Sequence, residues 1–121
     1  MRKAAQGLLF SFPKKCRLVS ESDFQSVFRQ SKKISRPSLR VLYKPNQLPH
    51  ARLGVLVSKR LVRKAVSRQA LKRLVRESFR HHQAQLVGFD VLVMPQKACD
   101  QQTRPIFRQE VDSAWRMINK A

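Results

Sequence analysis

Hydrophobic residues recur along this chain at two spacings, and the change from one spacing to the other predicts its elements. Phe24, Val27 and Phe28 are spaced as on one face of a helix and follow an acidic stretch, which is typical of a helix start. Residues 39–43 (LRVLY) and 51–58 (ARLGVLVS) are short apolar runs separated by a loop with two prolines, so we expect two strands. The first half of the chain is therefore predicted to be a helix followed by two strands.

The second half continues with a helix, a strand and a helix. Helical periodicity runs over residues 64–82, and residues 89–94 (FDVLVM) are apolar enough for a strand that is buried on both faces. Residues 103–105 (TRP) open a last helix, since proline is favoured in a first helical turn. The buried side of this helix comprises Phe107, Val111, Ala114, Trp115 and Ile118. The predicted order is α-β-β-α-β-α, a small sheet with helices packed on it, with residues 31–37 as a polar connection.

Gly54 interrupts the second predicted strand. It lies on the opposite face of that strand from Leu53, Val55 and Val57. A glycine inside a strand marks a bulge or a place where another part of the molecule approaches the backbone closely. We therefore expect one of these two features at this position.

The predicted helix over residues 64–82 carries its charge on one side. On a helical wheel its apolar side chains form one arc: Val66, Ala70, Leu71, Leu74 and Val75. The opposite arc, bordered by Arg68, is polar and basic: Gln69, Lys72, Arg73, Arg76 and Arg80. Such a helix can bury one face and hold the other as a row of cations, which suits the phosphate backbone of a nucleic acid. A solvated face that serves solubility alone and a helix on a membrane surface are the alternatives.

Composition strengthens the nucleic-acid interpretation. The 121 residues include 26 Lys and Arg against 7 Asp and Glu, a formal net charge of +19 at pH 7. That imbalance is typical of nucleic-acid binders, with an anionic membrane as the weaker alternative. A hydrophobic content of 42% is enough for one domain. We expect residues 1–19 to be a basic arm, docked through Phe10, Phe12 and Leu18, and residues 20–121 to be a single RNA-binding domain.

Side chains for catalysis or metal binding are sparse. The acidic residues form no paired-carboxylate motif, and three glycines provide no phosphate-binding loop. His81 and His82 are adjacent, so on a helix their side chains diverge by about 100°. Cys16 and Cys99 lack zinc-site spacing and form either one disulfide or two thiols in a reducing compartment. The sequence favours a binding protein without a metal of its own, and with neither a signal peptide nor a membrane-spanning run we expect it in the cytoplasm.

Several segments together resemble the protein subunit of bacterial ribonuclease P. They span most of the chain: LVSESDFQSVFR (18–29), LRVLY (39–43), RLGVLVSKR (52–60), KAVSRQALKRLVRESFR (64–80), GFDVLVMP (88–95) and FRQEVDSAWRMI (107–118). The resemblance implies the fold of that family, an α/β two-layer sandwich of the ribosomal-protein-S5-domain-2-like class. In that fold the central strand–helix–strand crossover is left-handed, an exception to the usual right-handed rule.

The resemblance also implies how such a protein acts. In this family a large RNA is the catalyst: it binds magnesium and hydrolyses a phosphodiester in precursor tRNA, which releases the 5′ leader. The protein subunit binds that RNA through the basic helix and holds the single-stranded leader in a cleft between the sheet and the first helix. Holding both RNAs lowers the magnesium requirement. No protein side chain is expected to be catalytic, and no cofactor, membrane or further protein partner is expected.

The resemblance assigns two sets of site residues. Contacts to the catalytic RNA are assigned to Lys59, Arg60, Lys64, Arg68, Gln69, Lys72, Arg73, Arg76 and Arg80. Contacts to the leader are assigned to Phe24, Phe28, Tyr43 and Ser58, with the aromatic rings stacking on unpaired bases. Two positions depart from the family pattern, since Gln69 stands where Asn is usual and Ala70 where Arg is usual. The alternative is a general or ribosomal RNA-binding protein, in which these rings are ordinary core, and a protein nuclease is a third hypothesis.

Overall fold

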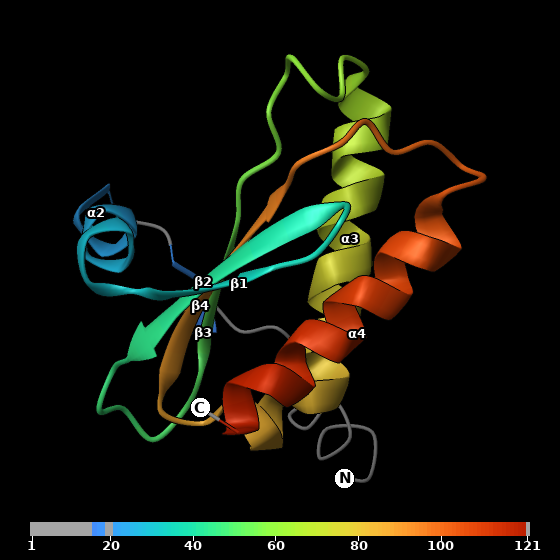
Figure 1. The fold of residues 1–121 in the computed structure, drawn as a ribbon. Helices are drawn as coiled ribbons and strands as arrows, with labels where there is room; N and C mark the ends of the chain where they lie inside the picture. The colour runs from blue at the N-terminus through green and yellow to red at the C-terminus, as the bar shows by residue number, and fades with distance from the viewer. Residues whose placement is uncertain (1–15, 19–20, 121) are drawn as a thin grey trace, which may run out of the picture.

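The computed structural model describes residues 16–18 and 21–120, whose helices and strands follow one another in a mixed α/β order (Figure 1). The helices are α2 (Glu21–Gln30), α3 (Ala65–His82) and α4 (Arg104–Lys120), with a 3-10 turn, η2 (Gln83–Leu86), directly after α3. The strands are β1 (Lys32–Ser35), β2 (Leu39–Pro45), β3 (Arg52–Val55) and β4 (Phe89–Pro95). This order contains every predicted element and one further strand, β1.

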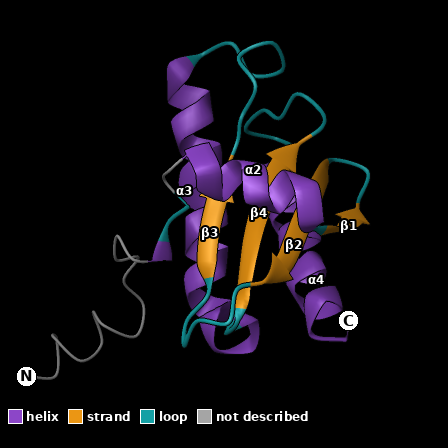
Figure 2. Cartoon of the chain, turned by 90° about the vertical axis from the view of Figure 1, so that its left-hand side faces the viewer, coloured by secondary structure: helices purple, strands orange, loops and turns teal. Residues whose placement is uncertain are grey.

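The four strands form one sheet in the order β1-β2-β4-β3. β1 pairs with β2 and β2 with β4 in antiparallel fashion, whereas β3 runs parallel to its neighbour β4. A parallel pair needs a crossover connection, and α3 supplies it, so the basic helix is the crossover of a strand–helix–strand unit. Figure 2 shows β3, β4 and β2 side by side with α2 crossing in front of them. The left-handed sense of this crossover stays a prediction.

Helices cover both faces of the sheet. α3 and α4 pack on one face and complete the two-layer sandwich, while α2 lies on the opposite face (Figure 1). The α3–α4 side contains the larger core, in which Phe79 and Trp115 are fully buried. The α2 side contains a smaller cluster, made of the buried Leu18, Val27, Leu42 and Leu92 with Phe24 and Met94 packed against it. Alternate residues of the strands supply the two sides, so the middle of β4 is buried on both faces, as predicted.

A buried polar chain fixes α3 against α4. The Nε1 of Trp115 donates to the Oγ of Ser78 at 2.8 Å, and the Ser78 hydroxyl donates to the carboxylate of Asp112. Ser78 is fully buried, and the rings of Phe79 and Trp115 meet edge to face with centroids 6.2 Å apart. The polar groups of Trp115, Ser78 and Asp112 are thus partners of one another, as buried polar groups require. Hydrogen bonds are directional, so these two fix the orientation of α3 against α4 and the direction in which its basic side faces.

Residues 31–37, predicted to be a polar connection, contain β1, so that prediction is wrong. Within β1 (KKIS) only Ile34 is buried, so the segment shows no repeating hydrophobic pattern and forms by pairing with β2. β3 is shorter than the predicted strand and ends at Val55. The chain continues beside β4 for one more residue, since the Leu56 N–H donates to the Val93 carbonyl at 3.0 Å.

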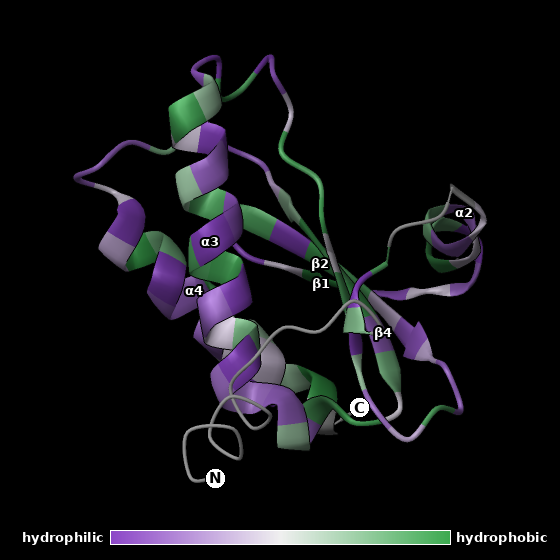
Figure 3. Ribbon diagram, turned by 180° about the vertical axis from the view of Figure 1, so that it is seen from behind, coloured by the Kyte–Doolittle hydropathy of each residue, from purple (hydrophilic) through white to green (hydrophobic). Residues whose placement is uncertain are grey.

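The apolar arc predicted for the basic helix is wrong at its N-terminal end. Val66 is 79% exposed and Ala70 is only partly buried. The buried side of α3 instead comprises Leu71, Val75, Ser78 and Phe79. The first turns of α3 extend beyond the end of the sheet (Figure 1), so no layer covers Val66. In Figure 3, which shows the molecule from behind the view of Figure 1, hydrophilic and hydrophobic residues alternate along the α3 and α4 ribbons, as expected for helices with one buried side.

Residues 16–18 attach to the edge of the sheet. The Leu18 N–H donates to the Leu53 carbonyl at 2.9 Å, and Arg17 forms a parallel bridge with Leu53. Leu18 is buried, in agreement with its predicted docking role. The other two docking residues, Phe10 and Phe12, lie outside the described residues.

The described cysteines and helices bear on two further expectations. Cys16 is buried, Cys99 is partly buried, and both are thiols, so the two cysteines form no disulfide with each other. Within residues 16–18 and 21–120, no helix combines the length and the apolarity that crossing a membrane requires.

Candidate nucleic-acid interface

The polar side of α3 and the turn before it carry the cations predicted to contact RNA. Those that are exposed, with one amide, are Lys59, Arg60, Lys64, Gln69 and Arg73. Those that are partly buried are Arg68, Lys72, Arg76 and Arg80. The single acid of α3, Glu77, pairs with Arg80 at 2.8 Å and with His81 at 3.5 Å. Positive charge therefore dominates the outward side of this helix.

Arg68 has a structural role in addition to its predicted contact. Its Nη1 donates to the backbone carbonyls of Val62 at 3.0 Å and Arg63 at 2.8 Å. Both carbonyls belong to the segment between β3 and α3, so the guanidinium braces the turn that leads into the helix. The bracing also limits where the cations of residues 59–64 can lie.

A further cation joins α3 from outside the helix. Partial burial, and then the neighbouring Arg17, lower the pKa of Arg76 below its ordinary value. Arg17 therefore lies close enough to Arg76 for the two positive charges to repel each other. Arg17 belongs to the segment bridged to β3, and no sequence pattern predicts that it lies beside α3. Like charges held together favour an anionic partner.

A second basic surface lies on the α2 side of the sheet. A hollow of about 270 Å³, which we call the α2 groove, is lined by Phe28, Ser31, Lys33, Arg40, Leu42 and Met94. Phe28 is 50% exposed, and Lys33 and Arg40 place two cations in the same hollow. An exposed ring flanked by cations suits a single-stranded nucleic acid, because bases stack on the ring and phosphates pair with the cations.

Of the four residues predicted to contact the leader, Phe28 alone lines the α2 groove. Phe24 lies on the same face of the sheet but is partly buried against β3. A Cβ built on Gly54 would lie 2.8 Å from the Phe24 ring, so the ring rests directly on the strand backbone. This contact confirms the close backbone approach predicted for Gly54 and makes Phe24 a packing residue of α2.

Tyr43 is not brought together with the other predicted leader contacts. Its side chain is 5% exposed in the core on the α3–α4 face, and its ring meets that of Phe89 edge to face at 5.9 Å. Neighbouring strand residues face opposite sides, so Leu42 lines the groove and Tyr43 points away from it. Its assignment is therefore corrected to a core position. Ser58 is exposed in the turn after β3, where its Oγ accepts from the Arg60 N–H at 3.1 Å.

Five residues that line the α2 groove are missing from the predicted set: Ser31, Lys33, Arg40, Leu42 and Met94. A signal for Arg40 exists in the sequence, because it alternates with the buried Leu39 and Val41 and must face the other side of β2. Lys33 gives no such signal, since β1 lacks a hydrophobic pattern. The position of Met94 follows from the pairing of β4 with β2, which no local pattern encodes.

The described histidine side chains of α3 contact separate partners. His81 pairs with Glu77, whereas the Nδ1 of His82 donates to the Ser78 carbonyl at 2.8 Å, so the adjacent histidines point to different partners. In the part of the chain that the structure describes, no three His, Cys, Asp or Glu side chains are grouped as metal ligands would be. The described surfaces offer binding chemistry, with cations for phosphates and a ring for a base.

A helix lined with cations and a groove with an exposed aromatic ring define a nucleic-acid-binding protein. Comparison with known proteins identifies which one, since the family described as Ribonuclease P matches residues 12–119. The chain belongs to the ribonuclease P protein family.

Individual relatives resemble the chain over most of its length. The ribonuclease P protein component of Methylococcus capsulatus is 37% identical over 120 residues, which cover 99% of this chain and 94% of that protein. The same component of Acinetobacter baylyi is 38% identical over 113 residues, covering 93% and 86%. The RNase P protein from Thermotoga maritima, solved in complex with 1-(4-fluorophenyl)-2-thiourea, has a TM-score of 0.62 at 31% identity and covers 86% of this chain and 91% of its own. A Staphylococcus aureus RNase P protein mutant with defective mRNA degradation activity has a TM-score of 0.70 at 25% identity and covers 97% and 93%.

Proposed function

We propose that this chain is the RNA-binding protein cofactor of the ribonuclease P ribozyme. Its family makes it the protein component of a ribonucleoprotein endonuclease of tRNA processing. The finer proposal is that α3 binds the catalytic RNA and that the α2 groove holds the single-stranded 5′ leader of precursor tRNA. The observation that carries it is the presence of two basic surfaces whose helices lie on opposite sides of one sheet (Figure 1). One domain can then hold two RNA segments at once.

The α3 surface supplies affinity for the catalytic RNA through charge. Cations that pair with phosphates release counterions, so this binding weakens as salt rises. The proposed contacts are the predicted set between Lys59 and Arg80. Gln69, Ala70 and Arg73 line one shallow hollow on α3, so Arg73 supplies a cation beside the position where the family usually has an arginine.

The α2 groove supplies affinity for the leader with little sequence preference, because every base offers a face to stack on Phe28. Lys33 and Arg40 lie where they can pair with the leader phosphates. Holding substrate and catalytic RNA together lowers the magnesium concentration that the RNA needs for the same purpose. The RNA subunit holds that magnesium and carries out the hydrolysis, and no described side chain is assigned as acid, base or nucleophile.

A cleavage assay on precursor tRNA at low magnesium tests the proposal. Its three arms contain the protein alone, a bacterial ribonuclease P RNA alone, and the two together. Correct 5′ cleavage is expected only with both. If adding protein gives no gain despite tight, salt-sensitive RNA binding, a general RNA-binding function replaces the proposal. Cleavage by protein free of RNA would instead make the chain a nuclease.

The leader-binding role of the α2 groove has its own test. Phe28→Ala removes the exposed ring, and losing one stacked base weakens binding by about 1–3 kcal/mol, or roughly 5- to 150-fold. Holoenzyme affinity for precursor tRNA should fall by that factor, while affinity for the same tRNA without a leader should not change. Tyr43→Phe is the matched control, since it alters an aromatic residue of the opposite core. An equal loss with and without the leader would remove Phe28 from the leader site.

A further inference from the structure

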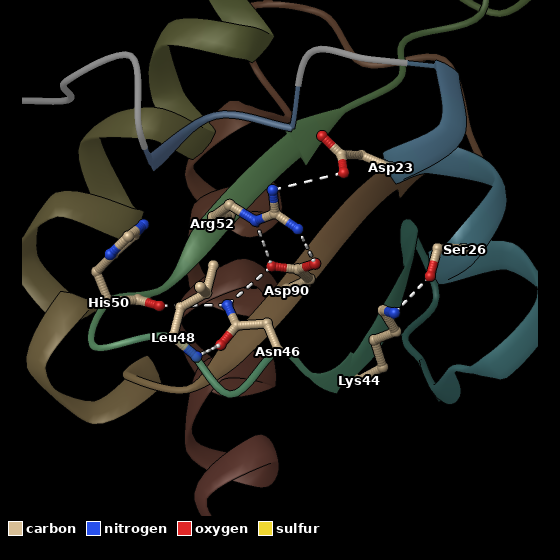
Figure 4. Close-up of polar contacts among 8 residues, drawn as sticks. All are labelled: Asp23, Ser26, Lys44, Asn46, Leu48, His50, Arg52 and Asp90. Carbon is tan, nitrogen blue, oxygen red and sulfur yellow. Dashed lines mark hydrogen bonds and ion pairs between the residues drawn. The ribbon is translucent and has the colours of Figure 1, made fainter.

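A buried carboxylate lies on the face of the sheet that α2 covers. Asp90 of β4 is 1% exposed. Arg52 donates to both of its oxygens, from Nε at 2.8 Å and from Nη2 at 2.7 Å, and the side-chain amide of Asn46 donates at 2.9 Å (Figure 4). Bidentate pairing and an additional hydrogen bond compensate the desolvation of such a buried charge. The guanidinium is therefore held in one orientation by the sheet itself.

Arg52 extends this contact to α2. Its Nη1 lies 3.5 Å from the Oδ1 of Asp23, in the first turn of that helix. Hydrogen bonding to Asp90, partly offset by burial, raises the pKa of Arg52 above its ordinary value, so the group is a permanent cation. Figure 4 shows the guanidinium between the two carboxylates. We name these three residues the Asp23–Arg52–Asp90 clasp.

The apolar cluster beneath α2 is small. Among the described residues, four buried hydrophobic side chains form the cluster under α2, against nineteen on the α3–α4 side. One turn beyond Asp23, the Nζ of Lys44 donates to the Oγ of Ser26. Gly54, two residues after Arg52 on the same face of β3, provides the surface on which Phe24 rests. Burial of the cluster stabilises the packing of α2, and the clasp adds a directional contact at the first turn of this helix.

We propose that the Asp23–Arg52–Asp90 clasp positions α2 over the sheet and thereby sets the width of the α2 groove at Phe28. Phe28 follows Asp23 by five residues on one helix, so a displacement of the first turn moves the ring. Neither Asp23 nor Arg52 lines the groove, so both act as positioning residues and not as contacts to RNA. The inference rests on the proposed function, in which this groove holds the leader.

Asp23→Asn tests the clasp because it removes the α2 end and leaves Asp90 paired with Arg52. The variant is more positive by one charge, so electrostatics alone predicts tighter RNA binding. Displacement of α2 and its Phe28 ring instead predicts weaker binding of the leader. The measurement is the leader-dependent gain, the ratio of holoenzyme affinities for a precursor tRNA and for the same tRNA without its leader. We expect this gain to fall about two- to five-fold, the range typical of losing one exposed ion pair. In the protein alone, amide hydrogen exchange over residues 21–30 should become faster.

Two further variants serve as controls. Glu77→Gln makes the same change of charge and removes an exposed ion pair with Arg80, but on α3. It should leave both the leader-dependent gain and the exchange of residues 21–30 unchanged. Asp23→Glu keeps the carboxylate and should restore most of the gain.

The outcomes separate this inference from the proposed function. Unchanged exchange over residues 21–30 in Asp23→Asn overturns the clasp whatever happens to RNA binding. Faster exchange with an unchanged or larger leader-dependent gain overturns its link to the groove. If the wild-type holoenzyme shows no leader-dependent gain, the proposed function fails. The proposed link between the clasp and leader binding in the α2 groove then fails as well. The exchange measurement still decides in that case whether the clasp holds α2.

Discussion

Replacing Gly54 by alanine adds one methyl group beneath α2. A Cβ at this position would lie 2.8 Å from Cε1 of Phe24, 3.1 Å from Cδ1 of Leu92 and 3.2 Å from Cβ of Leu18. Ordinary contact begins near 3.4 Å, so the Phe24 ring must withdraw by about 0.6 Å, the difference between 3.4 and 2.8. Withdrawal of the Phe24 ring does not relieve all the crowding, because the added Cβ also lies close to the Leu18 Cβ. That atom is fixed by the backbone of Leu18. The substitution should therefore push α2 away from the sheet.

Two effects of opposite sign decide the size of the change. Alanine restricts the unfolded chain and stabilises a protein by about 0.4–1 kcal/mol where the native backbone accepts it. Gly54 lies in β3 without a positive φ, so this gain applies. Overpacking of a filled site costs about 1–3 kcal/mol. The cost of overpacking exceeds the backbone gain, so we expect a net loss of about 1–2 kcal/mol in the free energy of unfolding.

Urea denaturation measures the net loss for Gly54→Ala, and hydrogen exchange over residues 21–30 shows whether α2 is the part that loosens. Gly88→Ala is a matched control, since nothing lies within 4 Å of its added Cβ but its φ is +89°. It should destabilise through backbone strain, by about 1–2 kcal/mol, without changing exchange in α2. Combining Gly54→Ala with Phe24→Leu should recover part of the loss. A neutral or stabilising Gly54→Ala would refute the reasoning, because crowding would then cost less than the backbone gain.

The packing of α3, its charge and the start of α4 each lead to a testable outcome. Ser78→Ala leaves the Trp115 indole N–H without its buried acceptor, so urea denaturation should show a loss of about 2–3 kcal/mol, and a loss below about 0.5 kcal/mol would contradict a role in stability. Arg73→Ala should reduce the slope of log affinity for the catalytic RNA against log salt by about one with thermal unfolding unchanged, and an unchanged slope would exclude Arg73 from the interface. The N–H and hydroxyl of Thr103 donate to Asp100 and lower the pKa of its carboxyl below 3.8. The ionised carboxylate therefore contributes stability that is complete above the pKa of Asp100 in the unfolded chain. This contribution is lost as pH falls through the lower pKa of Asp100 in the folded protein. The stability difference between wild type and Asp100→Asn in urea should thus be constant above about pH 5 and shrink below about pH 4, and an equal difference at pH 3 and pH 6 would contradict this assignment.

Long elements could be predicted from the sequence because each repeats its own pattern. α4 buries a periodic set of side chains that includes Phe107 and Trp115, and the apolar run of β4 is buried on both faces. β1 could not be predicted, because Ile34 is its only buried residue and one residue makes no pattern. A helical wheel predicts that Val66 is buried, because the wheel shows which residues share a face but not where the sheet beneath them ends; Val66 is exposed.

The candidate site was predictable in its chemistry and less so in its geometry. The basic residues of α3 could be chosen from their type and spacing, whereas the role of Phe28 was implied only by the family resemblance. The apolar run predicted the strand that contains Tyr43, and the resemblance assigned its ring to the leader. The side that the ring faces depends on the alternation within that strand, and the ring lies in the core on the α3–α4 face. Asp90 gave no signal, because its partner Arg52 lies 38 residues earlier and meets it only through the register of β3 on β4.

The two edges of the sheet are protected in different ways. β1 ends one side as a strand of four residues with Lys32 and Lys33 exposed, and charged side chains on a short edge strand oppose pairing with another molecule. β3 ends the other side, and there the Leu18 N–H already occupies the Leu53 carbonyl. Residues 16–18 thus cover the β3 edge and oppose its pairing with a strand of another molecule. A chain shortened beyond residue 18 would expose the β3 edge and open a route to aggregation.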